Sequence, residues 1–151
     1  EANLLDRLEL TRPELVIFTG GGIIRKAMLD VPTIGVLNCH MGVLPGYRGV
    51  DSVNWALLNR EPSSIGYTTH LMDEGIDTGP IIQKYSLGID VINQLRTVRN
   101  IEKAIEYRVC EALISDCIRL LENNMVLINQ KDSDGRQYFK MHKTLRNKII
   151  N

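Results

Sequence analysis

Two short apolar runs separated by a glycine-rich turn constrain the fold of this chain more than any other feature of its sequence. The first run covers residues 13–18 and the second covers residues 34–40. Between them, residues 19–22 predict a turn because they are rich in glycine, and residues 23–29 predict a short helix. A strand, a helix and a strand in this order form a βαβ unit with parallel strands and a right-handed crossover. The sequence therefore predicts an α/β fold.

Asn38, Cys39 and His40 end the second run and directly precede a loop. Because successive side chains of a strand point to opposite faces, we expect Asn38 and His40 on one face and Cys39 on the other. This position corresponds to the carboxyl edge of a sheet, where open α/β sheets bind ligands. From the residues alone, two interpretations remain open. Asn38 and His40 are hydrogen-bonding residues that end a strand, or they bring an amide and an imidazole to a reaction.

The consecutive glycines of the turn also allow two interpretations. A dinucleotide or phosphate site would require the last glycine of a GxGxxG motif or a following GK[ST], and residues 20–25 contain neither. Isolated glycine turns usually serve backbone geometry, and the missing side chains also let a flat ligand approach the backbone closely. The sequence therefore argues against a nucleotide site and keeps close approach of a flat ligand as an alternative.

A hairpin is predicted in the middle of the chain. Residues 65–72 and 80–87 are rich in β-branched and aromatic residues and flank a polar turn over residues 73–79. The turn carries three carboxylates, which are Asp73, Glu74 and Asp77. These are the groups that can pair with an imidazole at the end of a neighbouring strand.

Two further helices and a packed tail are predicted. Asp51 and the serine after it predict an N-cap, and apolar residues at intervals of three and four predict an amphipathic helix from about residue 95 to 122. Cys110 and Cys117 fall on or beside the apolar stripe of that helix, which favours a packing role over a redox role. Because the last segment is apolar in its middle, residues 125–151 are expected to dock on the rest of the chain.

Composition and charge exclude several classes of protein. The 151 residues fit one domain, and 18 basic against 18 acidic side chains leave no net charge to attract nucleic acid. Three cysteines without CxxC spacing predict neither a disulfide framework nor a metal site and fit a reducing compartment. No apolar stretch reaches the roughly 18 residues of a membrane span. We therefore expect a cytoplasmic protein without a membrane or nucleic-acid partner.

The candidate residues fit acyl transfer, in which a carbonyl oxygen becomes an oxyanion and a proton must leave the nucleophile. Asn38 can donate to the oxyanion, and His40 can add a second donor when it is protonated. A carboxylate from the turn over residues 73–79 would raise the pKa of His40 and fix its orientation. Cys39 is expected to face away from His40, and no GxSxG motif occurs. Direct transfer to a bound nucleophile is therefore favoured over a covalent intermediate.

Residues 38–49 and 66–82 together resemble the folate-dependent formyltransferase family. The family includes glycinamide ribonucleotide formyltransferase, the catalytic domain of methionyl-tRNA formyltransferase and amino-sugar N-formyltransferases. The resemblance implies a Rossmann-like fold, with a mostly parallel sheet flanked by helices, and a transferase enzyme. That fold normally starts with additional strands. Residues 1–151 are therefore expected to be a single catalytic domain without its N-terminal strands, that is, a C-terminal portion of it.

The resemblance also implies roles for individual residues. Asn38, His40 and Asp77 match the catalytic Asn, His and Asp of the family, and Asp77 would hold His40 charged and relay a proton from the attacking amine. His70 is expected to support the site by hydrogen bonding. Arg48 either steers an anionic substrate or is a solvated loop residue. The residues implied to line the folate pocket are Gly21, Gly22, Ile23, Ile24, Arg25, Asp73, Glu74 and Gly75.

The first hypothesis for function is an N-formyltransferase. It would move a formyl group from 10-formyltetrahydrofolate to a primary amine of a small acceptor, such as an amino sugar or a compound like glycinamide ribonucleotide. The same residues acting on water would make a formyltetrahydrofolate hydrolase. A third alternative is a catalytically incomplete homologue that only binds folate. A small-molecule amine is thus the expected partner, and a homo-oligomer is compatible with the sequence.

Overall fold

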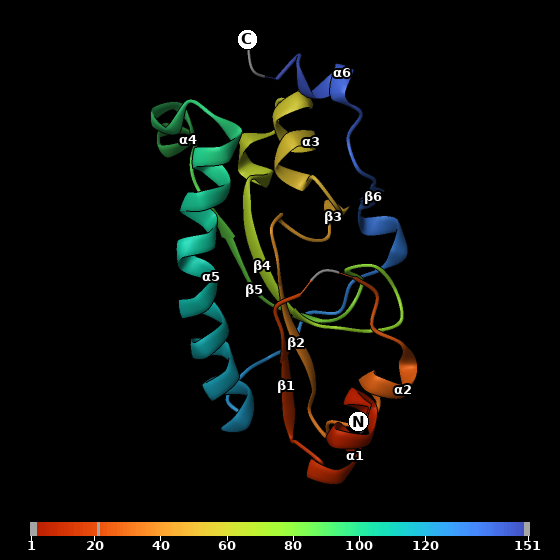
Figure 1. Cartoon of the computed structure of the whole chain (residues 1–151). Coiled ribbons are helices and arrows are strands. Elements are labelled where there is room, and N and C mark those ends of the chain that lie inside the picture. The colour runs from red at the N-terminus through yellow and green to blue at the C-terminus, as the bar shows by residue number, and fades with distance from the viewer. Residues whose placement is uncertain (1–2, 21, 150–151) are drawn as a thin grey trace.

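A computed structural model describes residues 3–20 and 22–149 of the chain (Figure 1). The helices are α1 (Leu4–Thr11), α2 (Lys26–Leu29), α3 (Ser52–Leu58), the 3₁₀ turn η1 (Pro62–Ser64), α4 (Ile89–Leu95), α5 (Val98–Leu121), the 3₁₀ turn η2 (Asp132–Asp134) and α6 (Lys143–Arg146). The strands are β1 (Leu15–Phe18), β2 (Gly35–His40), β3 (Tyr47–Gly49), β4 (Gly66–Leu71), β5 (Ile81–Ser86) and β6 (Arg136–Tyr138). None of the helices in these two ranges is long and apolar enough to cross a membrane.

The main sheet has the strand order β1-β2-β4-β5. β1 and β2 are parallel, with Phe18 opposite Asn38, so the predicted βαβ unit and the α/β class are confirmed. The sheet is mixed rather than mostly parallel, because β2 pairs antiparallel with β4 and β4 with β5. The predicted hairpin is the physical reason for the β4–β5 pair, but not for the β2–β4 pair, whose strands are separated by residues 41–65. Two strands joined by a short connection run in opposite directions, whereas parallel strands need a longer crossover.

The long helix α5 covers one face of the main sheet, as the left side of Figure 1 shows. Leu37 of β2 is fully buried there against Leu113 and Leu120 of the helix. α5 begins at Val98, three residues after the expected start, because Arg96 adopts a left-handed conformation with φ of 58° that ends α4. Thr97 then caps the new helix by accepting a hydrogen bond from the backbone N–H of its third residue.

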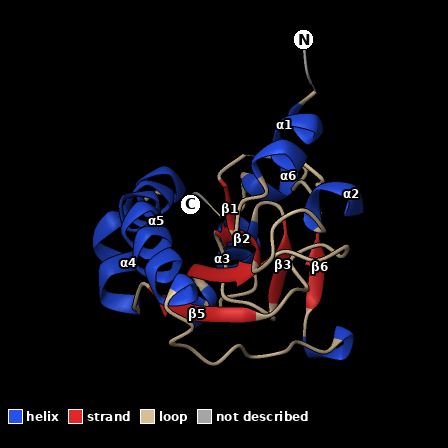
Figure 2. Cartoon of the chain, turned by 90° about the horizontal axis from the view of Figure 1, so that it is seen from below, coloured by secondary structure: helices blue, strands red, loops and turns tan. Residues whose placement is uncertain are grey.

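The tail of the chain returns to the middle of the molecule. β6 pairs in parallel with β3, and Figure 2 shows these two strands side by side, away from α4 and α5. The ring of Tyr138 stacks on Tyr47 with 4.8 Å between centroids, and Trp55 Nε1 donates to the carbonyl of Phe139 over 2.8 Å. Residues far apart in the sequence therefore form one layer next to α3.

Asp51 stands at the N-cap position of α3, as predicted, but its carboxylate does not cap the helix. It accepts hydrogen bonds from the backbone N–H of Met141 over 2.8 Å and from Arg146 Nη2 over 2.9 Å. The predicted N-cap position is therefore correct, but the capping hydrogen bond expected from its side chain is wrong. The φ of Asp51, 58°, is left-handed, whereas a residue whose side chain caps a helix typically has an extended conformation.

A buried carboxylate joins α5 to the sheet, and it supports a prediction of stability. Asp116 is fully buried and accepts from Thr69 Oγ1 over 2.6 Å and from Arg119 Nη1 over 3.0 Å. Replacing Thr69 by Val keeps the shape and removes a donor to a charged group, which costs about 1.5–3 kcal/mol. Urea unfolding of Thr69→Val should show this loss. Thr33→Val, on an exposed threonine, is the control, and equal stability of the two variants would contradict the prediction.

Candidate active site

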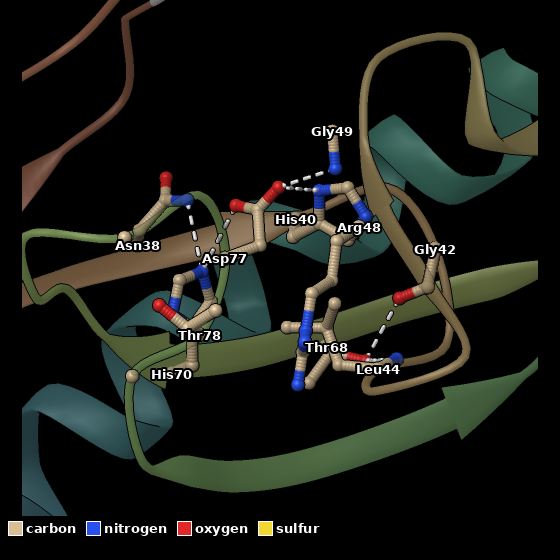
Figure 3. A network of polar contacts seen from close by, with 12 residues as sticks. Asn38, His40, Gly42, Leu44, Arg48, Gly49, Thr68, His70, Asp77 and Thr78 are labelled. Carbon is tan, nitrogen blue, oxygen red and sulfur yellow. Dashed lines mark hydrogen bonds and ion pairs between the residues drawn. The ribbon is translucent and has the colours of Figure 1, made fainter. Parts of the chain in front are cut away.

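The end of β2 carries the polar pair predicted from the sequence (Figure 3). Asn38 and His40 lie on the side where the loop after β4 passes, since Asn38 contacts His70 and His40 contacts Asp77. Cys39 lies on the opposite side and packs against the apolar residues under α5. The predicted alternation of side chains along this strand is confirmed.

The loop between β4 and β5 places the Asp77 carboxylate between two histidines (Figure 3). One oxygen, Oδ2, lies 3.3 Å from His40 Nδ1 and accepts from the backbone N–H of Gly49 over 2.8 Å. The other oxygen, Oδ1, lies 3.5 Å from His70 Nε2. Only Asp77 among the three carboxylates of this turn contacts a histidine within the described ranges, so the geometry selects it as the partner of His40.

His40 is almost completely buried, and both of its ring nitrogens face acceptors. Nε2 lies 2.6 Å from the carbonyl oxygen of Tyr47, to which it donates, while Nδ1 faces Asp77. Burial lowers the pKa of His40, and the negative charge of Asp77 opposes this effect. The neutral ring has one N–H and can donate to only one of these two acceptors. Because its pKa is lowered, the ring binds a second proton only weakly. This is the property required of a group that accepts a proton and gives it up again.

The pKa of Asp77 is held below its usual value despite burial. Burial alone would raise the pKa of this carboxyl group, but the contact with His70, the charge that His40 carries when it is protonated and the N–H of Gly49 outweigh it. Asp77 is therefore ionised near neutral pH. An ionised carboxylate beside a buried imidazole makes the two groups a single acceptor for one proton.

His70 fixes the orientation of the Asn38 amide. Its Nδ1 lies 3.0 Å from the carbonyl oxygen of Leu71, to which it donates. Nε2 is then an acceptor when the ring is neutral and a donor to Asp77 Oδ1 when the ring is protonated. Asn38 Nδ2 donates to Nε2 over 3.2 Å. An amide has two N–H donors, and within the described part of the chain the second one has no other partner. The supporting role expected for His70 thus takes the form of a hydrogen bond that orients Asn38.

Comparison with known proteins decides the family. A family model described as "Formyl transferase" matches residues 1–115. The chain belongs to the formyl transferase family. This confirms the family predicted from residues 38–49 and 66–82, and family membership indicates a transferase.

Individual relatives of the formyl transferase family extend the match. Methionyl-tRNA formyltransferase of Pelobacter propionicus is 47% identical over 79 residues, which cover 52% of this chain and 24% of that protein. Methionyl-tRNA formyltransferase of Caldanaerobacter subterraneus is 32% identical over 132 residues, covering 87% and 41%. A solved N-formyltransferase of Helicobacter canadensis, in complex with folinic acid and dTDP-3-aminofucose, has 30% identity and a TM-score of 0.57 over 67% of this chain and 37% of that one. The chain thus spans less than half of the length of each relative.

The two segments predicted to hold folate lie next to each other. Lys26 Nζ pairs with Glu74 Oε1 over 3.1 Å and so joins the segment after the glycine turn to the loop after β4. Asp73 shapes that loop by accepting from the N–H of Gly75 and from Thr78 Oγ1, over 3.0 and 2.6 Å. Of the predicted folate residues, Gly21 lies outside the described residues. The others, Gly22, Ile23, Ile24, Arg25, Asp73, Glu74 and Gly75, belong to these two segments.

The space beside the glycine turn fits a ligand that approaches the backbone. A Cβ atom added at Gly22 would meet nothing within 4 Å, and Ile23 is 83% exposed. An open backbone and an uncovered apolar side chain are compatible with a flat heterocycle. Over residues 3–20 and 22–149, no group of three or more His, Cys, Asp or Glu side chains is arranged to hold a metal ion.

Cys39 is the cysteine nearest to the site, and it should be unreactive. Burial and the nearby charge of Asp116 raise the pKa of Cys39 to about 12. Because each pKa unit above the pH of the experiment lowers the thiolate fraction about tenfold, Cys39 should react with iodoacetamide at pH 8 at least about a hundredfold more slowly than the exposed Cys110. Mass spectrometry of peptides from the folded protein measures both rates. Equal labelling would show that Cys39 ionises readily and would reopen a covalent mechanism.

Proposed function

We propose that this chain carries the transfer centre of an N-formyltransferase, which moves a formyl group from 10-formyltetrahydrofolate to a primary amine. The observation that carries the proposal is the meeting of three groups at one end of β2: the Asn38 amide, the His40 imidazole and the Asp77 carboxylate. They adjoin the two segments that meet at the ion pair of Lys26 and Glu74. The H. canadensis N-formyltransferase in complex with folinic acid supports this assignment of a folate donor.

Each group has a defined task in the proposed reaction. 10-Formyltetrahydrofolate supplies the formyl group. Asn38 directs its second N–H to the formyl oxygen and stabilises the negative charge that forms there when the amine attacks. The His40 and Asp77 pair accepts the proton that the amine loses and returns it to the departing nitrogen. One carbon–nitrogen bond forms, another breaks, and one proton passes through the pair, so the reaction needs no further reactant.

The acceptor that the chain favours is a small amine such as a nucleotide-linked amino sugar. The balanced charge of the chain, with 18 basic and 18 acidic side chains, provides no net attraction for a polyanion. The H. canadensis relative, in complex with dTDP-3-aminofucose, supports the same class. Methionyl-tRNA is the second candidate, because the relatives of up to 47% identity are methionyl-tRNA formyltransferases.

A turnover assay tests the proposal. The purified protein is mixed with 10-formyltetrahydrofolate and, in separate reactions, with a dTDP-linked amino sugar, glycinamide ribonucleotide, methionyl-tRNA or no amine. Release of tetrahydrofolate that depends on one of the amines is the expected result, and mass spectrometry identifies the N-formyl product. Turnover without an amine would indicate a hydrolase instead. Binding of tetrahydrofolate without turnover on any acceptor would indicate a folate-binding homologue and would overturn the proposal.

A further inference from the structure

Gln130 connects the tail of the chain to the loop that carries Asp77. It lies beyond residues 1–115, the part that the family model matches. Its side-chain Nε2 lies 3.0 Å from the carbonyl oxygen of Asp77 and 2.6 Å from that of Gly79, so it donates to both. The candidate catalytic carboxylate is thus fixed through its own backbone by a residue that is 53 positions away in the sequence.

The orientation of the Gln130 amide is determined by its neighbours. Oε1 accepts from Arg48 Nε over 3.4 Å and from Arg48 Nη2 over 3.2 Å. The guanidinium is buried and also donates to the carbonyl of Lys131 over 2.9 Å. Since Arg48 offers only donors and the loop offers only carbonyl acceptors, the amide has one arrangement that satisfies both sides. Arg48 therefore belongs to this buried network and is not a solvated loop residue.

The loop needs such support because of its backbone. Asp77 has a φ of 53°, a left-handed conformation that residues other than glycine seldom adopt, although aspartate adopts it more often than most. Such a conformation persists only when the surrounding structure holds it. Gln130 donates to the backbone carbonyls of Asp77 and Gly79, while the N–H of Gly49 donates to the Asp77 carboxylate.

We propose that Gln130 is a positioning residue for formyl transfer: it holds the Asp77 loop so that the carboxylate lies between His40 and His70. The proposal rests on the proposed function, because Gln130 touches neither reacting group and acts only through Asp77. Through this side chain, the tail affects the rate of the reaction. It does not affect the binding of folate, because the two segments predicted to bind folate meet at the separate ion pair of Lys26 and Glu74.

Two variants test this role. Gln130→Glu keeps the length and the acceptor for Arg48 but replaces the donor to the loop by an oxygen. Gln130→Met removes both polar contacts without adding charge. A misplaced catalytic group costs up to about a hundredfold in rate, so both variants should lower kcat by about 10- to 100-fold. The Kd for tetrahydrofolate should stay at the wild-type value. Gln137→Glu, the same change at an exposed glutamine of the tail, is the matched control and should keep wild-type kcat.

The outcomes separate this proposal from the function on which it rests. If the wild-type protein transfers formyl groups and both Gln130 variants keep the kcat of Gln137→Glu, the positioning role is refuted and the function stands. If kcat, the Kd for tetrahydrofolate and the free energy of unfolding all deteriorate together, Gln130 is a structural residue and the proposal is refuted as well. If the wild-type protein transfers to no amine, both proposals fall, and the control variant shows the same absence of activity.

Discussion

Replacing Asp77 by Asn should lower kcat of formyl transfer by about 10²- to 10⁴-fold, the usual contribution of a positioned acid or base. The amide keeps the shape of the carboxylate and can still accept from the N–H of Gly49. It cannot take up a proton near neutral pH, and it has no charge to stabilise a protonated His40, whose pKa burial lowers. The proton of the attacking amine then has no acceptor. Steady-state rates with the amine identified in the acceptor panel measure the effect.

Asp90→Asn is the matched control for this variant, because Asp90 is exposed on α4 and the chemical change is the same. It should leave kcat unchanged. The Kd for tetrahydrofolate should be similar in wild type and Asp77→Asn, since the variant affects proton transfer. A kcat of Asp77→Asn within about threefold of wild type, far below the usual loss for an acid or base, would contradict the role given to Asp77.

Replacing Asn38 by Ala should have the second largest effect, a fall in kcat of about 10²- to 10³-fold, as found when one donor to an oxyanion is removed. The variant deletes the N–H that faces the formyl oxygen in the proposed reaction. It also leaves His70 Nε2 without the donor that lies 3.2 Å away. The stabilisation that Asn38 provides arises only as charge develops, so kcat should fall while the Kd for tetrahydrofolate changes little.

Asn93→Ala, at an exposed position of α4, is the control for the loss of an amide. It should retain the wild-type kcat. If Asn38→Ala instead weakens binding of tetrahydrofolate and leaves kcat intact, Asn38 is a binding residue and the oxyanion role is wrong. If neither quantity changes, Asn38 is only a hydrogen-bonding residue at the end of β2, the alternative that the sequence left open.

Local patterns made part of this architecture predictable. The apolar run that ends at Asn38 and His40 gave the correct strand, because alternation of side chains follows from backbone geometry alone. Residues 65–72 and 80–87 gave the correct hairpin because β-branched and aromatic residues flank a polar turn. The share of parallel pairing was overestimated because pairing between distant strands has no local signal. The start of α5 was misplaced because it depends on the left-handed conformation of Arg96, a residue without special propensity for it.

The network around the site was predictable only in part. The placement of Asp77 beside His40 agrees with the expectation from the family resemblance. The bond between His70 and Asn38 depends on the register of β2 against β4, which the sequence does not encode locally. Gln130 was missed entirely. A single glutamine after the apolar residues 125–128 forms no motif, and its position follows from the bridge of Ile128 with Ile81 and from the contact with Arg48, neither of which has a local signal.

The parallel pairing of β3 with β6 also has a consequence for the order in which the molecule acquires its final form. Residues 47–49 meet residues 136–138, so this contact has one of the longest sequence separations in the chain. Contacts of this kind slow folding because the entropy of closing a large loop is lost before any bond forms. During synthesis, all residues of the main sheet, which lie between 15 and 86, are made before Gln130 and β6. The two hydrogen bonds from Gln130 to the Asp77 loop are therefore the last contacts of the transfer centre whose residues become available.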